Sequence, residues 1–120
     1  MSGPSDTSAC LFCGIANGTI PATLLYSDDQ VVAFRDLNPQ APLHVLVIPR
    51  AHITGADDPR ATQGDTLAAM VRAANTVARH EGVAQSGYRL VLNVGPDAGQ
   101  TVFHLHLHLL GGRPMAWPPG

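Results

Sequence analysis

The chain has 120 residues, of which 45% are hydrophobic and 13% charged, and its formal net charge is −2. This length and composition are typical of one globular domain and exclude a disordered chain. The small negative charge excludes a basic field able to hold a long nucleic-acid backbone, so we expect no nucleic-acid partner. A small phosphate ligand remains compatible with this net charge.

The sequence has no pattern of a membrane or secreted protein. It contains no apolar run of about 18 residues, so we expect no membrane-spanning helix and no membrane partner. Residues 1–9 lack the basic and then apolar order of a signal peptide and are expected to be a flexible lead-in to a single domain at 10–120. A cytoplasmic location follows as the default, in which the cysteines stay reduced unless they hold metal.

The first half of the chain is expected to form a short helix and three strands. The helix covers residues 10–17 and ends at Gly18. Apolar runs at 24–27 and 31–34 flank Asp28-Asp29-Gln30, which predicts a β-hairpin. Two prolines exclude regular pairing over 38–42, and residues 45–48 then read as a buried strand.

The second half is expected to form one long helix and two strands. After a polar, turn-rich segment at 55–63, a helix is predicted from about Asp65 to His80, with Gly82 as its stop. Its apolar face is expected to consist of Leu67, Met70, Val71, Ala74, Val77 and Ala78. Strands are predicted at 88–94 and 101–110, separated by a loop, and the proline-rich tail at 111–120 is expected to be irregular. This order fits an α+β domain with an antiparallel sheet better than a βαβ repeat.

Histidines and leucines alternate strictly over residues 104–109. In a strand this puts three histidines on one face and three leucines on the other, where the leucines can pack on a core. Imidazole is a nucleophile, a general base and a metal ligand near neutral pH, so the histidine face predicts a catalytic or metal site. The alternative is an exposed edge strand with surface histidines.

The loop before the histidines is a candidate phosphate site. Gly99 permits close backbone approach, successive amide groups can bind an anion, and Thr101 adds a hydroxyl donor. An ordinary turn is the alternative interpretation.

Cys10 and Cys13 have the spacing that lets two thiolates reach one tetrahedral metal ion. His52 follows a predicted strand, and a Cys2His2 zinc site would need one more histidine. Two alternatives are a pair of reduced thiols with His52 on the surface, and a thioredoxin-like redox pair, for which the surrounding pattern is missing. His80 is expected to stabilise the end of the long helix and is assigned no chemistry.

Taken together, these segments resemble the histidine-triad (HIT) superfamily, and most closely its Hint-like branch of purine nucleoside phosphoramidases. The resemblance runs from about Leu11 to the last residue. It rests on the run at 104–110 and on Ile20-Pro21-Ala22, Ala33-Phe34-Arg35-Asp36, Pro39-Gln40-Ala41-Pro42, Leu46-Val47-Ile48-Pro49, Gly99-Gln100, Gly111-Gly112-Arg113 and Trp117-Pro118-Pro119-Gly120. It implies a HIT-like fold, with an antiparallel sheet of about five strands, one long helix and a short N-terminal helix.

The resemblance also implies roles for individual residues. His106 would be the nucleophile, His108 would contact the phosphate or the leaving group, and His44 would complete the histidine cluster. Asp36 would accept hydrogen bonds from the ribose, although a turn-stabilising carboxylate is the alternative. The phosphate site would be lined by Asn93, Gly99, Gln100, Thr101 and Val102. The base pocket would be formed by Leu11, Phe12, Ile15, Phe34 and Leu37, of which Phe34 and Leu37 could equally be plain core residues.

For the metal, the resemblance implies a zinc site like that of some bacterial-type members. Its ligands would be Cys10, Cys13, His52 and His104. Such a closed four-ligand site would be structural, because it leaves no open position for water. No organic cofactor is expected. A homodimer is expected, because Trp117 on an irregular tail suggests a docking surface and because the tail contacts the partner in the family.

The reaction expected from the resemblance is hydrolysis of purine nucleoside 5′-phosphoramidates through a nucleotidyl-histidine intermediate. Proton delivery to the leaving amine would come from His108 or from the substrate itself. One alternative is dinucleoside polyphosphate hydrolysis or nucleotidyl transfer, which His108 disfavours because those branches usually carry Gln there. Another is a non-catalytic nucleotide-binding protein, which would need no nucleophile.

Overall fold

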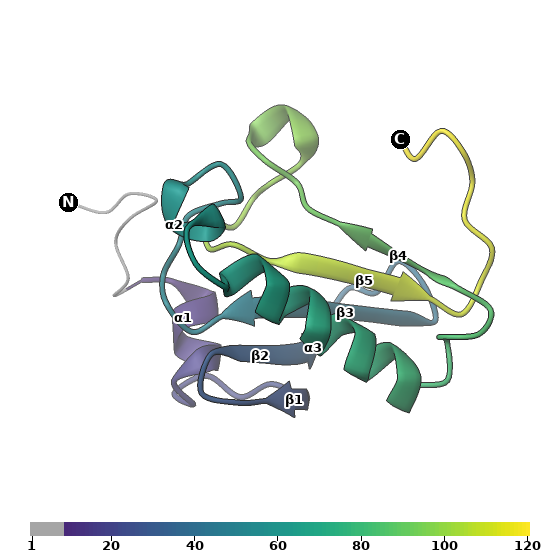
Figure 1. Ribbon diagram of the computed structural model, residues 1–120, viewed down its shortest axis with the longest axis horizontal. Coiled ribbons are helices and arrows are strands. Elements are labelled where there is room, and N and C mark those ends of the chain that lie inside the picture. The colour runs from purple at the N-terminus through teal and green to yellow at the C-terminus, as the bar shows by residue number, and fades with distance from the viewer. Residues whose placement is uncertain (1–8) are drawn as a thin grey trace.

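One antiparallel sheet forms the centre of the protein, and a computed structural model describes it, with its helices, over residues 9–120. The predicted lead-in at 1–9 lies outside the described residues except for Ala9. The strands are β1 (Leu24–Ser27), β2 (Val31–Arg35), β3 (Leu43–Pro49), β4 (Tyr88–Val91) and β5 (Leu107–Gly111), in the spatial order β1-β2-β3-β5-β4 (Figure 1). The helices are α1 (Leu11–Ala16), α2 (Pro59–Thr62), α3 (Thr66–His80) and the 3₁₀ turn η1 (Pro96–Ala98). The predicted α+β class, five-stranded sheet and two main helices are confirmed.

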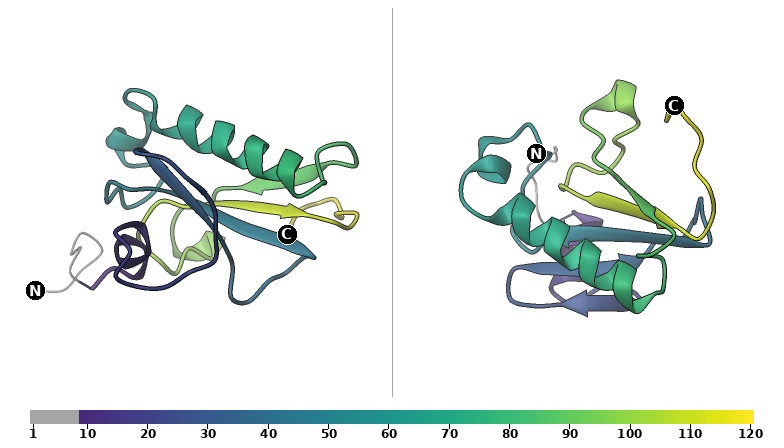
Figure 2. Two further views of the ribbon diagram at one scale, coloured as in Figure 1. Left: turned by 90° about the horizontal axis from the view of Figure 1, so that it is seen from below. Right: turned by 45° about the vertical axis from the view of Figure 1, so that its right-hand side comes forward.

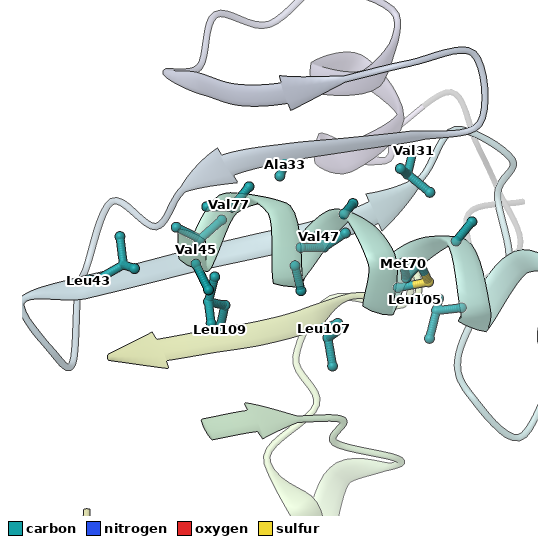
Figure 3. Close-up of a cluster of buried hydrophobic side chains, with 14 of the residues drawn as sticks. Val31, Ala33, Leu43, Val45, Val47, Met70, Val77, Leu105, Leu107 and Leu109 are labelled. Carbon is teal, nitrogen blue, oxygen red and sulfur yellow. The ribbon is translucent and has the colours of Figure 1, made fainter. Parts of the chain in front are cut away.

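The two faces of the sheet pack against different helices, with α3 on one face and α1 on the other (Figure 2). On the α3 face, alternate residues of the strands form the larger core, including Val45, Val47, Leu107 and Leu109 (Figure 3). On the α1 face, a smaller core contains Phe12, Ile15, Val32, Phe34, Leu46 and Ile48. Strands β2 and β3 therefore divide their side chains between the two cores, as the strand period of two dictates, whereas β5 contributes Leu107 and Leu109 to the larger core only.

Helix α3 is amphipathic and holds the larger core together. Met70 and Val77 are at most 1% exposed, and burying each such side chain stabilises the fold by about 1.5–3 kcal/mol. The helix begins one residue after the predicted position and ends at His80, so the prediction is confirmed. Val71 was placed on the wrong face, since it is 39% exposed. The electrostatic role of His80 stays a prediction.

Two strands are shorter than predicted, because a strand needs a partner along its whole length. In the ladder, β5 begins with Leu107 opposite Val47 of β3, and β4 ends with Val91 opposite His108. Residues 101–106 and 92–94 therefore lie outside the sheet and were wrongly assigned to strands.

The short helix α2 was missed within a segment that was read as a polar loop. Its signal was Asp58 followed by Pro59, a side-chain cap before a proline at the first helical position. No helix among residues 9–120 is long and apolar enough to cross a membrane.

Candidate active site and metal centre

The alternating segment separates core from chemistry as predicted, although only its second half is strand. Leu105, Leu107 and Leu109 are at most 3% exposed and join the core under α3. His106 and His108 are half-buried on the opposite face, with their ring centroids 5.1 Å apart. His106 faces α1, because its ring lies 5.1 Å from that of Phe12, and His108 lies beside it on the same side of the sheet.

The hydrogen bond of His106 fixes which of its nitrogens is free. Its Nδ1 lies 2.7 Å from the carbonyl oxygen of His104, and a carbonyl can only accept, so Nδ1 carries the proton. Burial lowers the pKa of His106, which favours the neutral ring. The lone pair of a neutral His106 is therefore on Nε2, as a nucleophile requires.

A chain of hydrogen bonds likewise orients His44 and His108. The backbone N–H of Gln40 donates to His44 Nδ1 over 3.0 Å, so the proton of a neutral His44 lies on Nε2. His44 Nε2 then donates to His108 Nδ1 over 2.9 Å, which leaves the proton of His108 on Nε2. Burial lowers the pKa of His44, and burial together with the neighbouring histidines lowers the pKa of His108 to about 4. Both rings are neutral at pH 7, so this chain is intact there.

An apolar pocket of about 250 Å³ opens beside His106, and we call it the base pocket. Phe12 connects the two, because its ring meets that of His106 at 5.1 Å and that of Phe34 at 5.5 Å. The lining residues are Leu11, Phe12, Ile15, Ile20, Pro21, Ala22, Phe34, Arg35, Asp36, Leu37, Leu46 and Val102. All five residues expected at a base pocket line this one, and their binding of a base stays a prediction. Sequence reasoning missed others, although Ile20-Pro21-Ala22 carried a signal as one of the segments shared with the family.

Leu37, Phe34 and Asp36 each had an alternative interpretation. The structure decides between the two for Leu37 and is compatible with both for Phe34 and Asp36. Leu37 is 99% exposed at the pocket, so it is not a core residue. Phe34 is 4% exposed and serves both the smaller core and the pocket wall. Asp36 accepts from the backbone N–H of Asn38 over 2.8 Å, as a turn-stabilising carboxylate does. Its other oxygen lies 3.5 Å from His44 Nε2 at the end of the pocket, so both interpretations of Asp36 are compatible with its position.

The loop before the histidines is built differently from the expected anion site. The backbone N–H groups of Gly99 and Gln100 donate to carbonyls within the loop, and Gly99 closes the η1 turn with a φ of +91°. Gln100 is 6% exposed, and its side chain binds Gly95 N–H and the carbonyls of Thr54 and Val102. Gly99 and Gln100 therefore position the loop instead of offering donors to a phosphate.

Other members of the expected phosphate site remain exposed to a ligand. Thr101 is exposed and its neighbour Val102 lines the base pocket. Asn93 lies with His44 and His108 in a second hollow of about 610 Å³, which we call the tail hollow because the C-terminal segment forms one side of it. The histidines thus lie between two hollows.

Cys10, Cys13, His52 and His104 converge as a second site, with all four ligand atoms within 4.8 Å of one another. His52 Nδ1 is 3.2 Å from Cys13 Sγ, and His104 Nδ1 is 3.4 Å from Cys10 Sγ. His104 Nε2 donates to the carbonyl oxygen of Pro49 over 2.8 Å, so its Nδ1 is bare and turned toward the thiols. The thiols form no disulfide. This donor set and orientation fit a tetrahedral zinc ion.

Asp36, His44 and His108 also lie close enough together to suggest a metal site. Their hydrogen bonds argue against it. Because Gln40 N–H occupies Nδ1 of His44, a neutral His44 holds its proton on Nε2, the atom that a metal would have to bind. The two clusters are therefore distinct, one suited to a metal and the other to proton positioning.

A family match agrees with this geometry. The model of the HIT domain matches residues 17–115. The chain belongs to the HIT domain family. Each feature that carried the predicted resemblance lies within or next to this match, so the resemblance is confirmed.

The chain is similar in sequence and structure to hydrolases and zinc-binding proteins. It is 45% identical over 105 residues to the purine nucleoside phosphoramidase of Escherichia coli strain K12, covering 88% of each chain. It is 45% identical over 117 residues to a 14 kDa zinc-binding protein of Zea mays, covering 96% of this chain and 91% of the relative. The crystal structure of a HIT family hydrolase from Legionella pneumophila Philadelphia 1 has a TM-score of 0.88 and 51% identity, covering 92% of this chain and 99% of that one.

Proposed function

We propose that the protein hydrolyses purine nucleoside 5′-phosphoramidates, with His106 as the nucleophile. The nucleoside would occupy the base pocket, and Asp36 at its end would accept hydrogen bonds from the ribose hydroxyls. The phosphoryl group would lie between His106 and His108, within reach of Thr101 and Asn93. The similarity to a purine nucleoside phosphoramidase supports this substrate class.

The observation that carries the proposal is the hydrogen bond from His106 Nδ1 to the carbonyl oxygen of His104. It holds the ring in place and leaves Nε2 as the only atom with a free lone pair. A binding protein would gain nothing from a histidine oriented in this way, whereas a nucleophile needs both the orientation and the lone pair.

The reaction would proceed in two displacements at phosphorus. In the first, His106 Nε2 forms a bond to the α-phosphorus while the P–N bond to the amine breaks, and the amine nitrogen takes up a proton. That proton would come from the substrate itself, because a neutral His108 cannot release its Nε2 proton without becoming an anionic ring. The Nε2–H of His108, fixed by the hydrogen bond from His44, would instead donate a hydrogen bond to a phosphoryl oxygen. In the second, water attacks phosphorus and gives up a proton to the solvent, the bond to His106 breaks with its electron pair returning to Nε2, and a nucleoside monophosphate leaves. Thr101 and Asn93 would stabilise charge on the phosphoryl oxygens.

The test compares the unchanged chain with His106→Ala and His106→Asn on an adenosine 5′-phosphoramidate. We expect both variants to lose turnover while calorimetry still detects adenosine monophosphate binding. Rapid quenching of the unchanged chain, followed by mass spectrometry, should detect a nucleotidyl adduct on the peptide that contains His106. Full turnover by either variant would refute the mechanism.

Zinc held by Cys10, Cys13, His52 and His104 would serve the structure of this enzyme. The similarity to a zinc-binding protein supports the assignment. When bound, the ion would supply a positive charge that holds both thiols as thiolates, which matters because burial and the neighbouring Cys10 raise the pKa of Cys13 to about 11. With all four positions taken by the protein, it would tie α1 to the segment that leads into His106.

A substrate panel separates this proposal from its two alternatives. A dinucleoside polyphosphate hydrolase or nucleotidyltransferase would prefer diadenosine polyphosphates or transfer to a second phosphate. A non-catalytic binding protein would bind nucleotides and form no adduct. Preference for the phosphoramidates, with adduct formation, supports the proposal over both.

We also propose that the protein acts as a homodimer. Trp117 is 83% exposed on the tail, and β4 is an edge strand whose outer side has no partner in the described part of the chain. Exposed aromatic residues and open strand edges are both typical of protein interfaces. Light scattering after size exclusion should give twice the mass of one chain, and a monomeric mass would contradict this.

A further inference from the structure

We infer that Cys10 and Cys13 form a thiol switch, in which oxidation of the pair to a disulfide by a peroxide releases the zinc ion and weakens nucleotide binding in the base pocket. The inference rests on the proposed function, which supplies the ion and the nucleotide, and it names the regulation of that same site. The reduced, zinc-loaded chain is the form with high nucleotide affinity, and reduction of the disulfide restores it.

The two cysteines are close enough to form a disulfide without any change in the sheet. They begin the first turn of α1, where the N–H of Gly14 donates to the carbonyl oxygen of Cys10 over 3.1 Å and the N–H of Cys13 donates to Cys10 Sγ over 3.3 Å. Their two sulfur atoms lie within 4.8 Å of each other. Disulfide oxidoreductases form a reversible disulfide with the same two-residue spacing. Side-chain rotation and a small shift at the start of α1 therefore bring the sulfurs to the bonding distance of about 2.0 Å.

A peroxide can reach the pair, because Cys10 lines a surface hollow of about 510 Å³, which we call the cysteine hollow. The Cys10 sulfur attacks one oxygen of hydrogen peroxide, the O–O bond breaks, and a sulfenic acid forms with release of water. The Cys13 sulfur then displaces the hydroxyl group from Cys10, and this group takes up a proton and leaves as a second water. One disulfide forms and one peroxide is reduced to two waters, with protons from the thiols, or from the solvent where the pair is held as thiolates.

Oxidation removes two of the four zinc ligands and also the partners of a buried histidine. The metal ligand is the thiolate, and a disulfide sulfur has neither its negative charge nor a proton to donate. His104 Nδ1 lies 3.4 Å from Cys10 Sγ and 3.5 Å from Cys13 Sγ, and the residue is fully buried. Neither sulfur can satisfy this nitrogen after oxidation, and proteins avoid buried polar atoms without a partner. We therefore expect the segment that carries His104 to rearrange.

Two connections carry this change to the nucleotide site. The carbonyl oxygen of His104 accepts the hydrogen bond from His106 Nδ1 over 2.7 Å, so a movement of His104 changes the orientation of the proposed nucleophile. Phe12 lies between the two cysteines in the sequence, and its ring lies 5.1 Å from that of His106 and 5.5 Å from that of Phe34. Drawing the sulfurs together therefore displaces a side chain that forms one wall of the base pocket.

The other end of α1 is anchored, so the beginning of the helix is the part that moves. The guanidinium group of Arg50 donates to the carbonyl oxygen of Ala16 at the end of α1, and also to the carbonyl oxygen of Asp28 in the β1–β2 turn. Leu11 and Ile20 line both the cysteine hollow and the base pocket, so they separate the two. A shift at the start of α1 therefore acts on the pocket directly.

The experiment measures the affinity of the zinc-loaded chain for adenosine monophosphate by calorimetry, before and after treatment with hydrogen peroxide. We expect peroxide to lower the mass of the chain by two hydrogen atoms, to release zinc to a coloured chelator, and to leave the circular dichroism of the sheet unchanged. The affinity should fall about fivefold or more, which is the lower end of coupling between two sites. Dithiothreitol and fresh zinc should restore it. Equal affinities, or a loss that these reagents do not reverse, as methionine oxidation would cause, would refute the inference.

Variants test the pair and its connection to the pocket through the ratio of the two affinities. Cys10→Ser and Cys13→Ser cannot form the disulfide, so peroxide should leave their nucleotide affinity unchanged. Phe12→Leu shortens the contact with the nucleophile and should bring the ratio closer to one. Phe103→Leu makes the same change at a partly exposed side chain next to His104 and should keep the ratio of the unchanged chain. A full response to peroxide in either serine variant, or equal ratios in the two leucine variants, would overturn the inference.

Coupling between two sites is reciprocal, which gives a readout that a purely structural role of zinc would not move. If zinc raises the affinity for adenosine monophosphate by some factor, the nucleotide must raise the affinity for zinc by the same factor. Competition with a chelator at equilibrium measures this second affinity, with and without saturating nucleotide. A zinc affinity that does not respond to nucleotide would refute the switch.

Nuclear magnetic resonance separates failure of the switch from failure of the proposed function. If the reduced, zinc-loaded chain bound no adenosine monophosphate, the proposed function would be refuted, and the spectrum of the free chain would decide on the switch. Ala22, Leu46 and Val102 line the base pocket and are remote from the cysteines in the sequence. Their amide signals should shift on oxidation and return on reduction with zinc. Unchanged signals would refute the switch.

Discussion

Replacing Gln100 by alanine should loosen the loop that carries Thr101 and leave the rest of the sheet intact. The buried amide makes three hydrogen bonds to backbone groups, namely Gly95 N–H and the carbonyls of Thr54 and Val102. A hydrogen bond contributes about 0.5–1.5 kcal/mol, so we expect the free energy of unfolding to fall by about 2–4 kcal/mol. For a chain of 120 residues, each kcal/mol lowers the melting temperature by about 4 °C, which gives a decrease of about 8–16 °C.

The assay is thermal denaturation together with calorimetric titration of adenosine monophosphate. Gln85→Ala is the matched control, because Gln85 is exposed in the turn after α3 and its loss should change neither quantity. We expect Gln100→Ala to lose both stability and nucleotide affinity. If Gln100→Ala melted like the control but bound nucleotide much more weakly, Gln100 would contact the phosphate directly and our assignment of it as a positioning residue would be wrong.

Four further outcomes follow from the structure. Cys13→Ser should lower the zinc content measured by mass spectrometry from about one equivalent to well below it, and an unchanged content would contradict the assigned ligands. Leu109→Ala removes a fully buried side chain and should lower the free energy of unfolding by about 2–5 kcal/mol in urea denaturation. Leu37→Ala, at a 99% exposed position, should leave unfolding unchanged and weaken nucleotide binding in calorimetry. Burial lowers the pKa of His108 from the ordinary 6.5 to about 4, so as the pH falls the unfolded chain protonates this histidine before the folded chain does. The contribution of His108 to the free energy of unfolding is therefore full above pH 6.5 and decreases toward pH 4. His108→Asn should make the melting temperature depend less on pH over this range.

The division between core and chemistry was predictable from the sequence, whereas the extent of the strands was not. Alternation alone assigns Leu107 and Leu109 to the core, because side chains in extended backbone alternate between faces. It cannot tell where pairing begins, since that depends on the length of β3 and β4 as neighbours. His104 and His106 keep the alternating arrangement although they precede the strand.

For the site, residue types could be predicted but hydrogen-bond partners could not. Gln100 and Thr101 are adjacent and polar, and nothing in the sequence indicates that one side chain turns inward while the other is exposed. Gln40 acts through its backbone N–H, which donates to His44, and through its backbone carbonyl, which accepts from the side chain of Arg113. Every residue has these backbone groups, so only the fold could reveal the contacts. The spacing of Cys10 and Cys13 was informative because a metal ion constrains its ligands geometrically.

The alternating segment that ends in β5 divides the positions that affect folding from the positions that are proposed to affect activity. Leu105, Leu107 and Leu109 pack under α3, while His106 and His108 lie on the other side, where we propose that they carry out the reaction. Saturation mutagenesis of the segment should therefore give a profile with a period of two, in which one set of positions governs protein abundance and the other governs activity at normal abundance. New specificities can accordingly arise on the histidine face without loss of the fold.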